Sequence, residues 1–348
     1  MWEALGRKVP LSVGLLAGSE RNRRWSNELP AEVSHHRFRA GVLRADADPL
    51  YVLKGLALRR FGRDDAVVLP GWEHPAAWQL LAEARMRGVA TVAFYESNRQ
   101  SHRFARGPIP RARSWFFQHV DVVLTVGQAS WSVVTECGVD PSCVVMTHNS
   151  IDTDAFANDS VGGELPNRET KRFAYVGQLI QRKNVESLLR ALALCGGDYE
   201  LDVVGEGPLE ANLRALAESL GVATRVTFCG YVEPEAVAQR LKAVSTLVLP
   251  STAEVFGLAP VEALAFGRHV VVSSAAGVTA DIAGMPGVWV ADPDPVALSH
   301  AMCASSNDWD GPIGDPPIRE WTPDRFAADA LHAVQLAILR RQGRRWRG

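Results

Sequence analysis

The chain has 348 residues, which is enough for two domains of ordinary size. Hydrophobic residues make up 47% of it and charged residues 22%, the balance of a soluble globular protein. The net charge of -2 provides no overall attraction to nucleic acid, so we expect no nucleic-acid partner.

The five cysteines are scattered, odd in number and without a Cys-x-x-Cys pair. This usage favours a reducing compartment and argues against a structural zinc site, and we expect no metal site. The opening segment has too short an apolar core for a signal peptide, and no run approaches the length of a membrane span. We therefore expect a cytoplasmic protein, and we leave open peripheral contact with the inner face of a membrane.

The first expected elements are a strand and a basic loop. Residues 9–17 form an apolar run that ends in a small-residue turn at Gly18. Short β-like runs follow at residues 36–43 and 67–69. The polar stretch after the turn contains arginines that either meet an anionic acceptor or lie in solvent, namely Arg21, Arg23 and Arg24.

A strand, a helix and a second strand are expected between residues 67 and 95. Pro75 stands near the start of the helix, Gly88 ends it, and residues 91–95 form the next strand. Since ligand sites in parallel sheets gather at the carboxyl ends of strands, the residues at both strand exits are candidate acceptor contacts. These residues are Trp72, Glu73, His74, Glu96, Ser97, Asn98 and Arg99.

Residues 99–113 are rich in arginine, and Phe104, Trp115 and Phe116 lie near them in the sequence. The stretch can bind a phosphorylated or lipid-linked acceptor at a membrane surface, or it can be a solvated loop that leads into a helix. His102 within it either joins the acceptor site or is a solvated histidine.

A composition change marks a domain boundary. Residues 154–169 are rich in Asn, Asp, Gly and Pro, as a hinge should be. We therefore assign residues 1–160 to an N-terminal domain and residues 161–325 to a C-terminal one, followed by a final helix and basic tail at residues 326–348. Beyond the hinge we expect strands at residues 172–176, 201–205, 226–229 and 287–291, and helices at residues 185–194, 209–220 and 295–303.

The segment at residues 247–274 reads as a βαβ unit. An apolar strand at residues 247–249 is followed by a polar loop and a helix that opens near Leu258, with Pro260 in its first turn. Gly267 stands just past the helix end, and a β-branched run at residues 270–272 forms the next strand.

Two carboxylates flank the start of this helix. Glu254 lies in the loop and Glu262 about one turn inside the helix, so both can face one cleft. Between them, Phe256, Gly257 and Leu258 offer backbone N–H groups at a helix N-terminus, which favours an anion such as a diphosphate. Carboxylates beside an anion site suit a ligand that also carries hydroxyls, and this combination indicates a nucleotide sugar.

The sequence AEVFGLAPVEALAFGRHVV, with its two glutamates and flanking strands, resembles the motif of the retaining family 4 glycosyltransferases, the glycosyl transferases group 1. The resemblance implies an α/β protein of GT-B fold. Two Rossmann-like domains would face a central cleft, and the C-terminal helix would cross back to the N-terminal domain.

The resemblance also implies the roles of residues in the C-terminal domain. Glu254 would approach the donor sugar, the amides of Phe256, Gly257 and Leu258 would hold the β-phosphate, and Glu262 would bind the ribose hydroxyls. The family carries an Arg after Gly177 and a Lys five residues later, and both neutralise the leaving diphosphate. Lys183 matches the Lys, whereas Gln178 replaces the Arg, so Arg182 would supply the second charge. Further positions implied to contact the nucleotide are Gly177, Gln178, Gly205, Tyr231 and Val232.

In the N-terminal domain the resemblance is looser. The family's first loop would correspond to the turn at Gly18, although this turn is sparse in glycine. Glu96 takes the place of a His near the reacting sugar, and it can accept a proton or a hydrogen bond from an acceptor hydroxyl. The residues implied to contact the acceptor are Gly18, Trp72, Glu96, Arg99 and His102.

The implied activity is metal-independent transfer of a sugar, with retention, from a nucleoside diphosphate sugar to an acceptor hydroxyl, without a cofactor. The acceptor is a glycan, a lipid-linked molecule, a small molecule or a protein, and neither the nucleobase nor the sugar can be deduced. One alternative is a sugar-nucleotide epimerase or a phosphorylase on the same fold, although no segment indicates a pyridoxal lysine. Another is a non-catalytic protein that binds nucleotide sugars.

Overall fold

The fold comes from a computed structural model that describes residues 1–16, 33–44, 50–101, 106–151, 169 and 171–343. The chain divides into two compact units. Unit 1 contains residues 1–96, 102–150 and 323–348, and unit 2 contains residues 97–101 and 151–322. The two units are described separately below.

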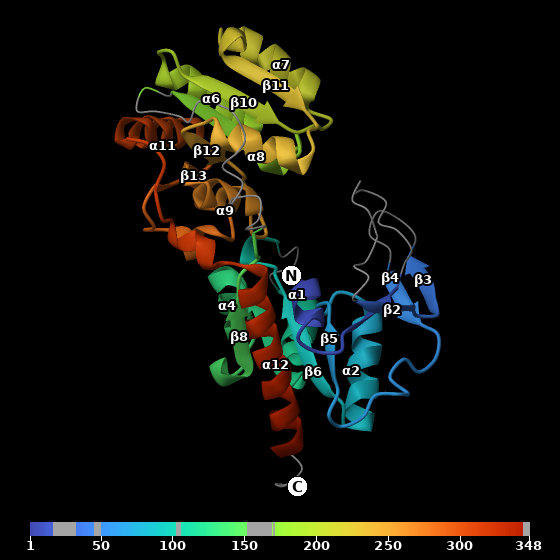
Figure 1. Ribbon diagram of the computed structural model, residues 1–348. Coiled ribbons are helices and arrows are strands. Elements are labelled where there is room, and N and C mark those ends of the chain that lie inside the picture. The colour runs from blue at the N-terminus through green and yellow to red at the C-terminus, as the bar shows by residue number, and fades with distance from the viewer. Residues whose placement is uncertain (17–32, 45–49, 102–105, 152–168, 170, 344–348) are drawn as a thin grey trace. The chain divides into compact units, whose positions relative to one another are not determined.

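A four-stranded parallel sheet forms the centre of unit 1, in the order β5-β6-β7-β8 (Figure 1). Along β6 and β7, alternate side chains point to opposite faces, as the pleat of a strand requires. Val92 and Leu124 pack against the first and last helices, whereas Ala93 and Val123 pack against the other helices. The strands are β5 (Ala66–Leu69), β6 (Ala90–Tyr95), β7 (Val122–Val126) and β8 (Val144–Thr147), and the helices are α1 (Trp2–Gly6), α2 (Pro75–Arg87), α3 (Pro108–His119), α4 (Gly127–Glu136) and α12 (Pro323–Gly343).

The last helix, α12, belongs to unit 1, as expected for a terminal helix that returns to the N-terminal domain. Its buried stripe consists mainly of alanines, which let the helix lie close to β6, β7 and β8. Near its end, Arg341 Nε donates to the buried Asp121 carboxylate at 3.1 Å. Asp121 also accepts bonds from the backbone and hydroxyl of Thr91, so one carboxylate joins α12 to two strands of the sheet.

The N-terminal strands stand apart from this sheet. The expected strand at residues 9–17 is β1 (Ser12–Leu15), which pairs in parallel with β2 (Ser34–Arg37) as a separate two-stranded sheet. The β-like run at residues 36–43 is divided between β2 and β3 (Ala40–Arg44), and β3 forms an antiparallel hairpin with β4 (Leu50–Leu53).

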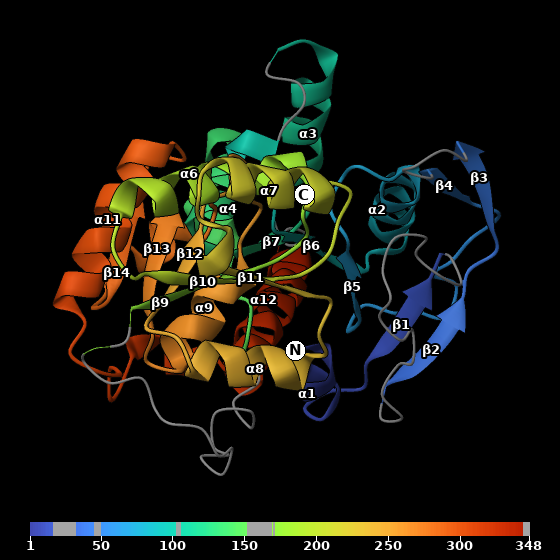
Figure 2. The same ribbon diagram turned by 90° about the horizontal axis from the view of Figure 1, so that it is seen from above.

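Unit 2 contains a six-stranded, fully parallel sheet in the order β11-β10-β9-β12-β13-β14. Helices α6, α7 and α11 cover one face, with a leucine-rich core beneath them, and α8 and α9 lie on the other face (Figure 2). The strands are β9 (Arg172–Val176), β10 (Glu200–Val204), β11 (Val226–Gly230), β12 (Thr246–Leu249), β13 (His269–Ser273) and β14 (Val288–Ala291). The helices are α6 (Val185–Cys195), α7 (Glu210–Ser219), α8 (Pro234–Lys242), α9 (Leu258–Ala265), α10 (Thr279–Ile282) and α11 (Pro295–Asp308).

The unit boundaries differ in detail from the expected domains. The chain passes into unit 2 after Ser150, ahead of the predicted boundary at residue 160, and it returns at Pro323. The short segment Ser97–Ser101 also belongs to unit 2, which the sequence did not predict. Among the described helices, none combines the length and the apolar character needed to cross a membrane.

Candidate functional site in unit 2

The site is built around the loop between β12 and α9. Gly257 caps α9 with φ 105° and ψ 91°, a backbone conformation that residues with a side chain rarely adopt. A Cβ at this position would lie 3.0 Å from Leu249 Cδ2 and 3.5 Å from Glu254 Cγ. The glycine therefore lets the helix begin directly against the Glu254 side chain.

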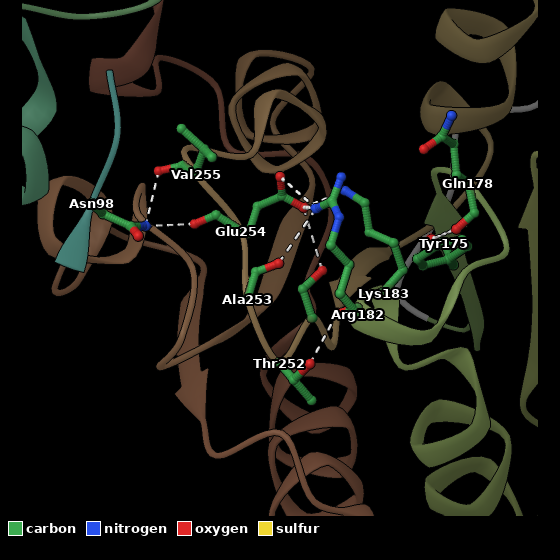
Figure 3. Close-up of polar contacts among 10 residues, drawn as sticks. Asn98, Tyr175, Gln178, Arg182, Lys183, Thr252, Ala253, Glu254 and Val255 are labelled. Carbon is green, nitrogen blue, oxygen red and sulfur yellow. Dashed lines mark hydrogen bonds and ion pairs between the residues drawn. The ribbon is translucent and has the colours of Figure 1, made fainter. Parts of the chain in front are cut away.

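The Glu254 carboxylate lies among cations. Lys183 Nζ donates to its Oε2 atom, and Arg182 Nη1 lies 3.5 Å from each carboxylate oxygen (Figure 3). The hydroxyl of the buried Ser251 donates to Oε2 at 3.5 Å. Glu254 and Lys183 side chains are 11% and 13% exposed, whereas Arg182 is 47% exposed. Lys183 and Glu254 thus form a mostly buried ion pair with Arg182 at its solvent side.

Backbone bonds join the two loops that carry these charges. Thr252 donates to Arg182 O through its N–H at 2.9 Å and through its hydroxyl at 3.2 Å. Asn184 ends the 3-10 turn Gln181–Lys183 with φ 56°, and Asn is among the residues that tolerate this left-handed conformation. Its side-chain amide donates to Pro250 O at 3.0 Å, which anchors the turn beside the exit of β12.

The turn after β9 is packed equally closely. Tyr175 is buried, and its hydroxyl donates to Gln178 O at 2.8 Å. Burial raises the pKa of the Tyr175 hydroxyl, and the Glu254 charge adds to the effect, so the hydroxyl stays a hydrogen-bond donor. Gly205, at the end of β10, has φ 133°, and a Cβ there would lie 2.0 Å from Gly177 O. Glycine at this position therefore permits the two strand exits to touch.

The first turn of α9 is the place where the sequence predicted an anion site. Within the described part of the chain, the amides of Phe256, Gly257 and Leu258 donate none of the hydrogen bonds found in turns, loops and caps. Glu262 lies in the next turn of the same helix, and burial raises the pKa of its carboxyl. We find no hydrogen bond to the Glu262 side chain from any described residue. This helix end can accept an anion, and Glu262 can accept hydroxyl hydrogens when it is ionised.

The other residues predicted to contact the donor also lie in unit 2. Gln178 follows Gly177 and has an exposed side chain. Tyr231 and Val232 follow β11, and the Tyr231 side chain is 47% exposed. The structure thus gathers the predicted donor residues at strand exits of one sheet, and it brings Glu254, Lys183 and Arg182 into direct contact.

The predicted acceptor residues are distributed differently. Trp72 and Glu96 lie in unit 1, at the exits of β5 and β6. Trp72 is half-buried, with the Arg113 guanidinium 5.9 Å from its ring centroid, whereas Glu96 is exposed. Arg99 is exposed and belongs to unit 2. Gly18 and His102 lie outside the described residues.

Some contacts at the site were missed by sequence reasoning. Asn184 had a usable signal, because Asn adopts the left-handed conformation more readily than most residues with a side chain. Tyr175 reads as an ordinary strand residue, and Asn98 was expected to contact the acceptor. The buried Asn98 amide instead donates to backbone carbonyls of Glu254 and Val255, and no local pattern reveals a partner 156 residues away.

No metal centre is visible in the part of the chain that the structure describes, since no three His, Cys, Asp or Glu side chains gather there as ligands would. The prediction of a metal-independent reaction remains a prediction.

Comparison with known proteins shows that the residues of this site lie in a segment that matches a protein family. The family of group 1 glycosyl transferases matches residues 160–310, which include Lys183 and Glu254. An uncharacterised glycosyltransferase of Methanocaldococcus jannaschii is 32% identical over 144 residues, 40% of this chain and 37% of that protein. The 2-deoxystreptamine glucosyltransferase of Streptomyces kanamyceticus is 24% identical over 285 residues, 75% of this chain and 73% of that protein.

Solved structures support the same fold. The HepE protein of Anabaena, solved in complex with UDP, has a TM-score of 0.59 and 17% identity, covering 80% of this chain and 77% of that one. Several curated relatives are matched over only about a third of their own length. The matched segment and the glycosyltransferase relatives show that residues 160–310 resemble the group 1 glycosyl transferases, and the parallel sheets of the two units agree with a GT-B fold.

Proposed function

We propose that this protein is a retaining glycosyltransferase that uses a nucleoside diphosphate sugar. The observation that carries the proposal is the contact of Glu254 with Lys183 and Arg182, directly before the helix end with free amides. One place thus offers cations and N–H groups for a diphosphate beside a carboxylate for sugar hydroxyls. The glycosyltransferase relatives support the class of reaction.

The diphosphate would lie at the start of α9. The amides of Phe256, Gly257 and Leu258 would donate to its oxygens, and Lys183 and Arg182 would balance its charge. Negative charge on the diphosphate grows as the bond to the sugar breaks, so fixed cations stabilise the transition state more than the bound substrate.

The two carboxylates would bind hydroxyls at opposite ends of the nucleotide sugar. Glu254 would accept hydrogen bonds from the donor sugar, and Glu262 would accept them from the ribose. Glu254 and Lys183 neutralise each other, because each would otherwise be a mostly buried, unpaired charge. A bound diphosphate would share the Lys183 ammonium and leave Glu254 able to bind the sugar.

In this proposal the bond between the anomeric carbon and the β-phosphate oxygen breaks, and a bond to the acceptor oxygen forms on the same face. The acceptor proton passes to the departing diphosphate, so no metal or cofactor enters the scheme. Trp72 and Glu96 in unit 1, with Arg99, are proposed to contact the acceptor. We also propose that the enzyme acts in the cytoplasm, where a lipid-linked acceptor would bring it to the inner face of the membrane.

The donor site is tested by melting temperature, with the protein alone and with UDP, GDP, ADP or dTDP in large excess. A ligand at a hundred times its dissociation constant adds about 2.7 kcal/mol of stability. We expect one diphosphate to raise the melting temperature, and Lys183→Ala to abolish the rise. The control is Lys171→Ala, which removes an exposed lysine before the opposite end of β9.

The reaction is tested with the sugar form of the diphosphate that binds. We expect release of the diphosphate to depend on an acceptor, and NMR of the product to reveal the donor's anomeric configuration. Unchanged transfer by both Glu262→Ala and Lys183→Ala would refute the proposal. Interconversion of the nucleotide sugar without an acceptor would favour an epimerase instead.

A further inference from the structure

A short segment of the first half of the chain lies against the Glu254 loop. Residues 97–101 belong to unit 2, although the chain on both sides of them belongs to unit 1. Asn98 in this segment is 5% exposed. Its Nδ2 atom donates to Glu254 O at 2.6 Å and to Val255 O at 3.1 Å (Figure 3).

The same loop is held from a second direction. Gly277 N–H donates to Glu254 O at 3.1 Å, and Val278 N–H donates to Phe256 O at 2.9 Å. A Cβ on Gly277 would lie 1.9 Å from Val255 O and 3.1 Å from Asn98 Nδ2, so only glycine leaves room for this arrangement. Three consecutive carbonyl groups therefore have hydrogen-bond partners.

Orienting these carbonyls also orients the amides that follow them. A carbonyl and the next residue's N–H lie in one rigid plane and point in opposite directions. Fixing Val255 O thus fixes the direction of Phe256 N–H, and fixing Phe256 O fixes that of Gly257 N–H. These two amides donate none of the loop and cap hydrogen bonds among the described residues, so they can bind an anion.

We infer that Asn98 is a positioning residue, which fixes the peptide planes after Glu254 and Val255 and thereby aims the Glu254 side chain and the Phe256 amide at the donor substrate. The inference rests on the proposed function for its catalytic consequence. The orientation of the loop is a property of the ligand-free protein and can be measured without any substrate.

Two substitutions separate hydrogen bonding from shape. Asn98→Asp keeps the size of the side chain but replaces the N–H donor with an oxygen that faces two carbonyls, and Asn98→Ala removes the group. We expect kcat to fall about tenfold in Asn98→Ala, the factor that one or two ordinary hydrogen bonds correspond to. Asn98→Asp should be slower still, and KM for the nucleotide sugar should change less than kcat, because the aimed groups act mainly in the transition state.

Hydrogen exchange of a peptide that covers residues 252–260 measures the loop directly. We expect exchange to be about tenfold faster in both variants, and unchanged in Asn212→Ala, which makes the same substitution at an exposed position of α7. If Asn98→Ala does not fold, Asn98→Ser keeps one hydroxyl donor, and its kcat and exchange rate should lie between those of the wild type and Asn98→Asp.

The outcomes are distinct. Wild-type kcat in Asn98→Asp, or unchanged exchange in the folded variants, would overturn the inference. If the wild-type protein does not turn over any nucleotide sugar, the proposed function fails, and the exchange measurement alone decides whether Asn98 positions the loop.

Discussion

The two parallel sheets end differently at the edge where ligands are expected. In unit 2, glycines at strand exits and at the α9 cap allow backbone groups to touch, and the Glu254 loop is tied by backbone bonds to its neighbours. In unit 1, β6 ends at Tyr95 and is followed by the exposed Glu96, and Trp72 follows the exit of β5. An edge lined by backbone recognises a group by charge and shape, as suits a diphosphate. An edge lined by side chains suits a ligand that differs between enzymes, such as the acceptor.

The packing of the helices differs as well. In unit 1, the alanine stripe of α12 lies close to the sheet, and in unit 2 leucines from α6 and α7 fill the core. Changes in the α12 stripe should therefore alter stability without altering nucleotide binding, whereas changes in the Glu254 loop should alter catalysis.

The largest effect is expected from Glu254→Gln. Loss of the carboxylate removes the group that we propose binds the donor sugar, and it leaves the Lys183 ammonium without the Glu254 carboxylate as its partner. We expect kcat to fall about 10²–10³-fold, the cost of removing one preorganised catalytic group. Nucleotide affinity, measured by calorimetry, should change by less. The matched control is Glu218→Gln, at an exposed position of α7. The proposed role of Glu254 fails if Glu254→Gln loses affinity for the nucleotide but keeps its rate.

A smaller loss is expected from Lys183→Arg. Arginine keeps the positive charge, but its planar head cannot replace a compact ammonium in a mostly buried pair. We expect kcat to fall about tenfold to a hundredfold while the diphosphate still raises the melting temperature. The control is Arg190→Lys, which swaps the same two residue types at an exposed position of α6. Full activity in Lys183→Arg would mean that only the charge at this position matters.

In unit 1, Ala333→Leu should destabilise the fold. Ala333 is fully buried in the stripe of α12, and added methyl groups in a close-packed core typically cost about 1–3 kcal/mol. Urea unfolding measures this free energy, with Leu339→Ala as the control at a position that is 66% exposed. The rise in melting temperature caused by the diphosphate should be unchanged. Loss of that rise would contradict the expectation that the α12 stripe affects stability and not nucleotide binding.

The smallest effect concerns pH. Burial raises the pKa of the Glu262 carboxyl, and the ionised form is the stronger acceptor for the ribose hydroxyls that we propose it binds. Nucleotide affinity should therefore increase several-fold as the pH rises through the raised pKa, and Glu262→Gln should flatten this dependence when affinity is titrated by calorimetry.

The raised pKa of Glu262 also predicts that the stability of the fold decreases as the pH rises, whereas nucleotide affinity increases. Because the folded protein favours the protonated carboxyl, stability is unaffected below the ordinary pKa of Glu and is lost as the pH rises through the raised value. Unfolding of the ligand-free protein at several pH values checks the sign, and Glu262→Gln should lose this part of the pH dependence.

Local patterns in the sequence were sufficient for most elements and for the loop and helix start that carry Glu254. Gly88 ends α2 in the left-handed conformation, with φ 73°, and Pro323 begins α12, because these residues act through their own backbone geometry. Glu254 and the start of α9 are neighbours in the chain, so their proximity follows from the spacing of the motif. The contact between Glu254 and Lys183 joins residues 71 apart, and it depends on the pairing of β9 with β12, which local patterns do not determine.

Only the tertiary structure decided the contacts that join distant segments. The bond from Asn98 to the Glu254 loop spans 156 residues, and the bond from Arg341 to Asp121 spans 220. The separate β1-β2 sheet and the assignment of residues 97–101 to unit 2 also depend on which segments pack together. The sequence determines the geometry of turns, caps and strand faces within a few residues, whereas pairing between distant groups depends on the folding of the whole chain.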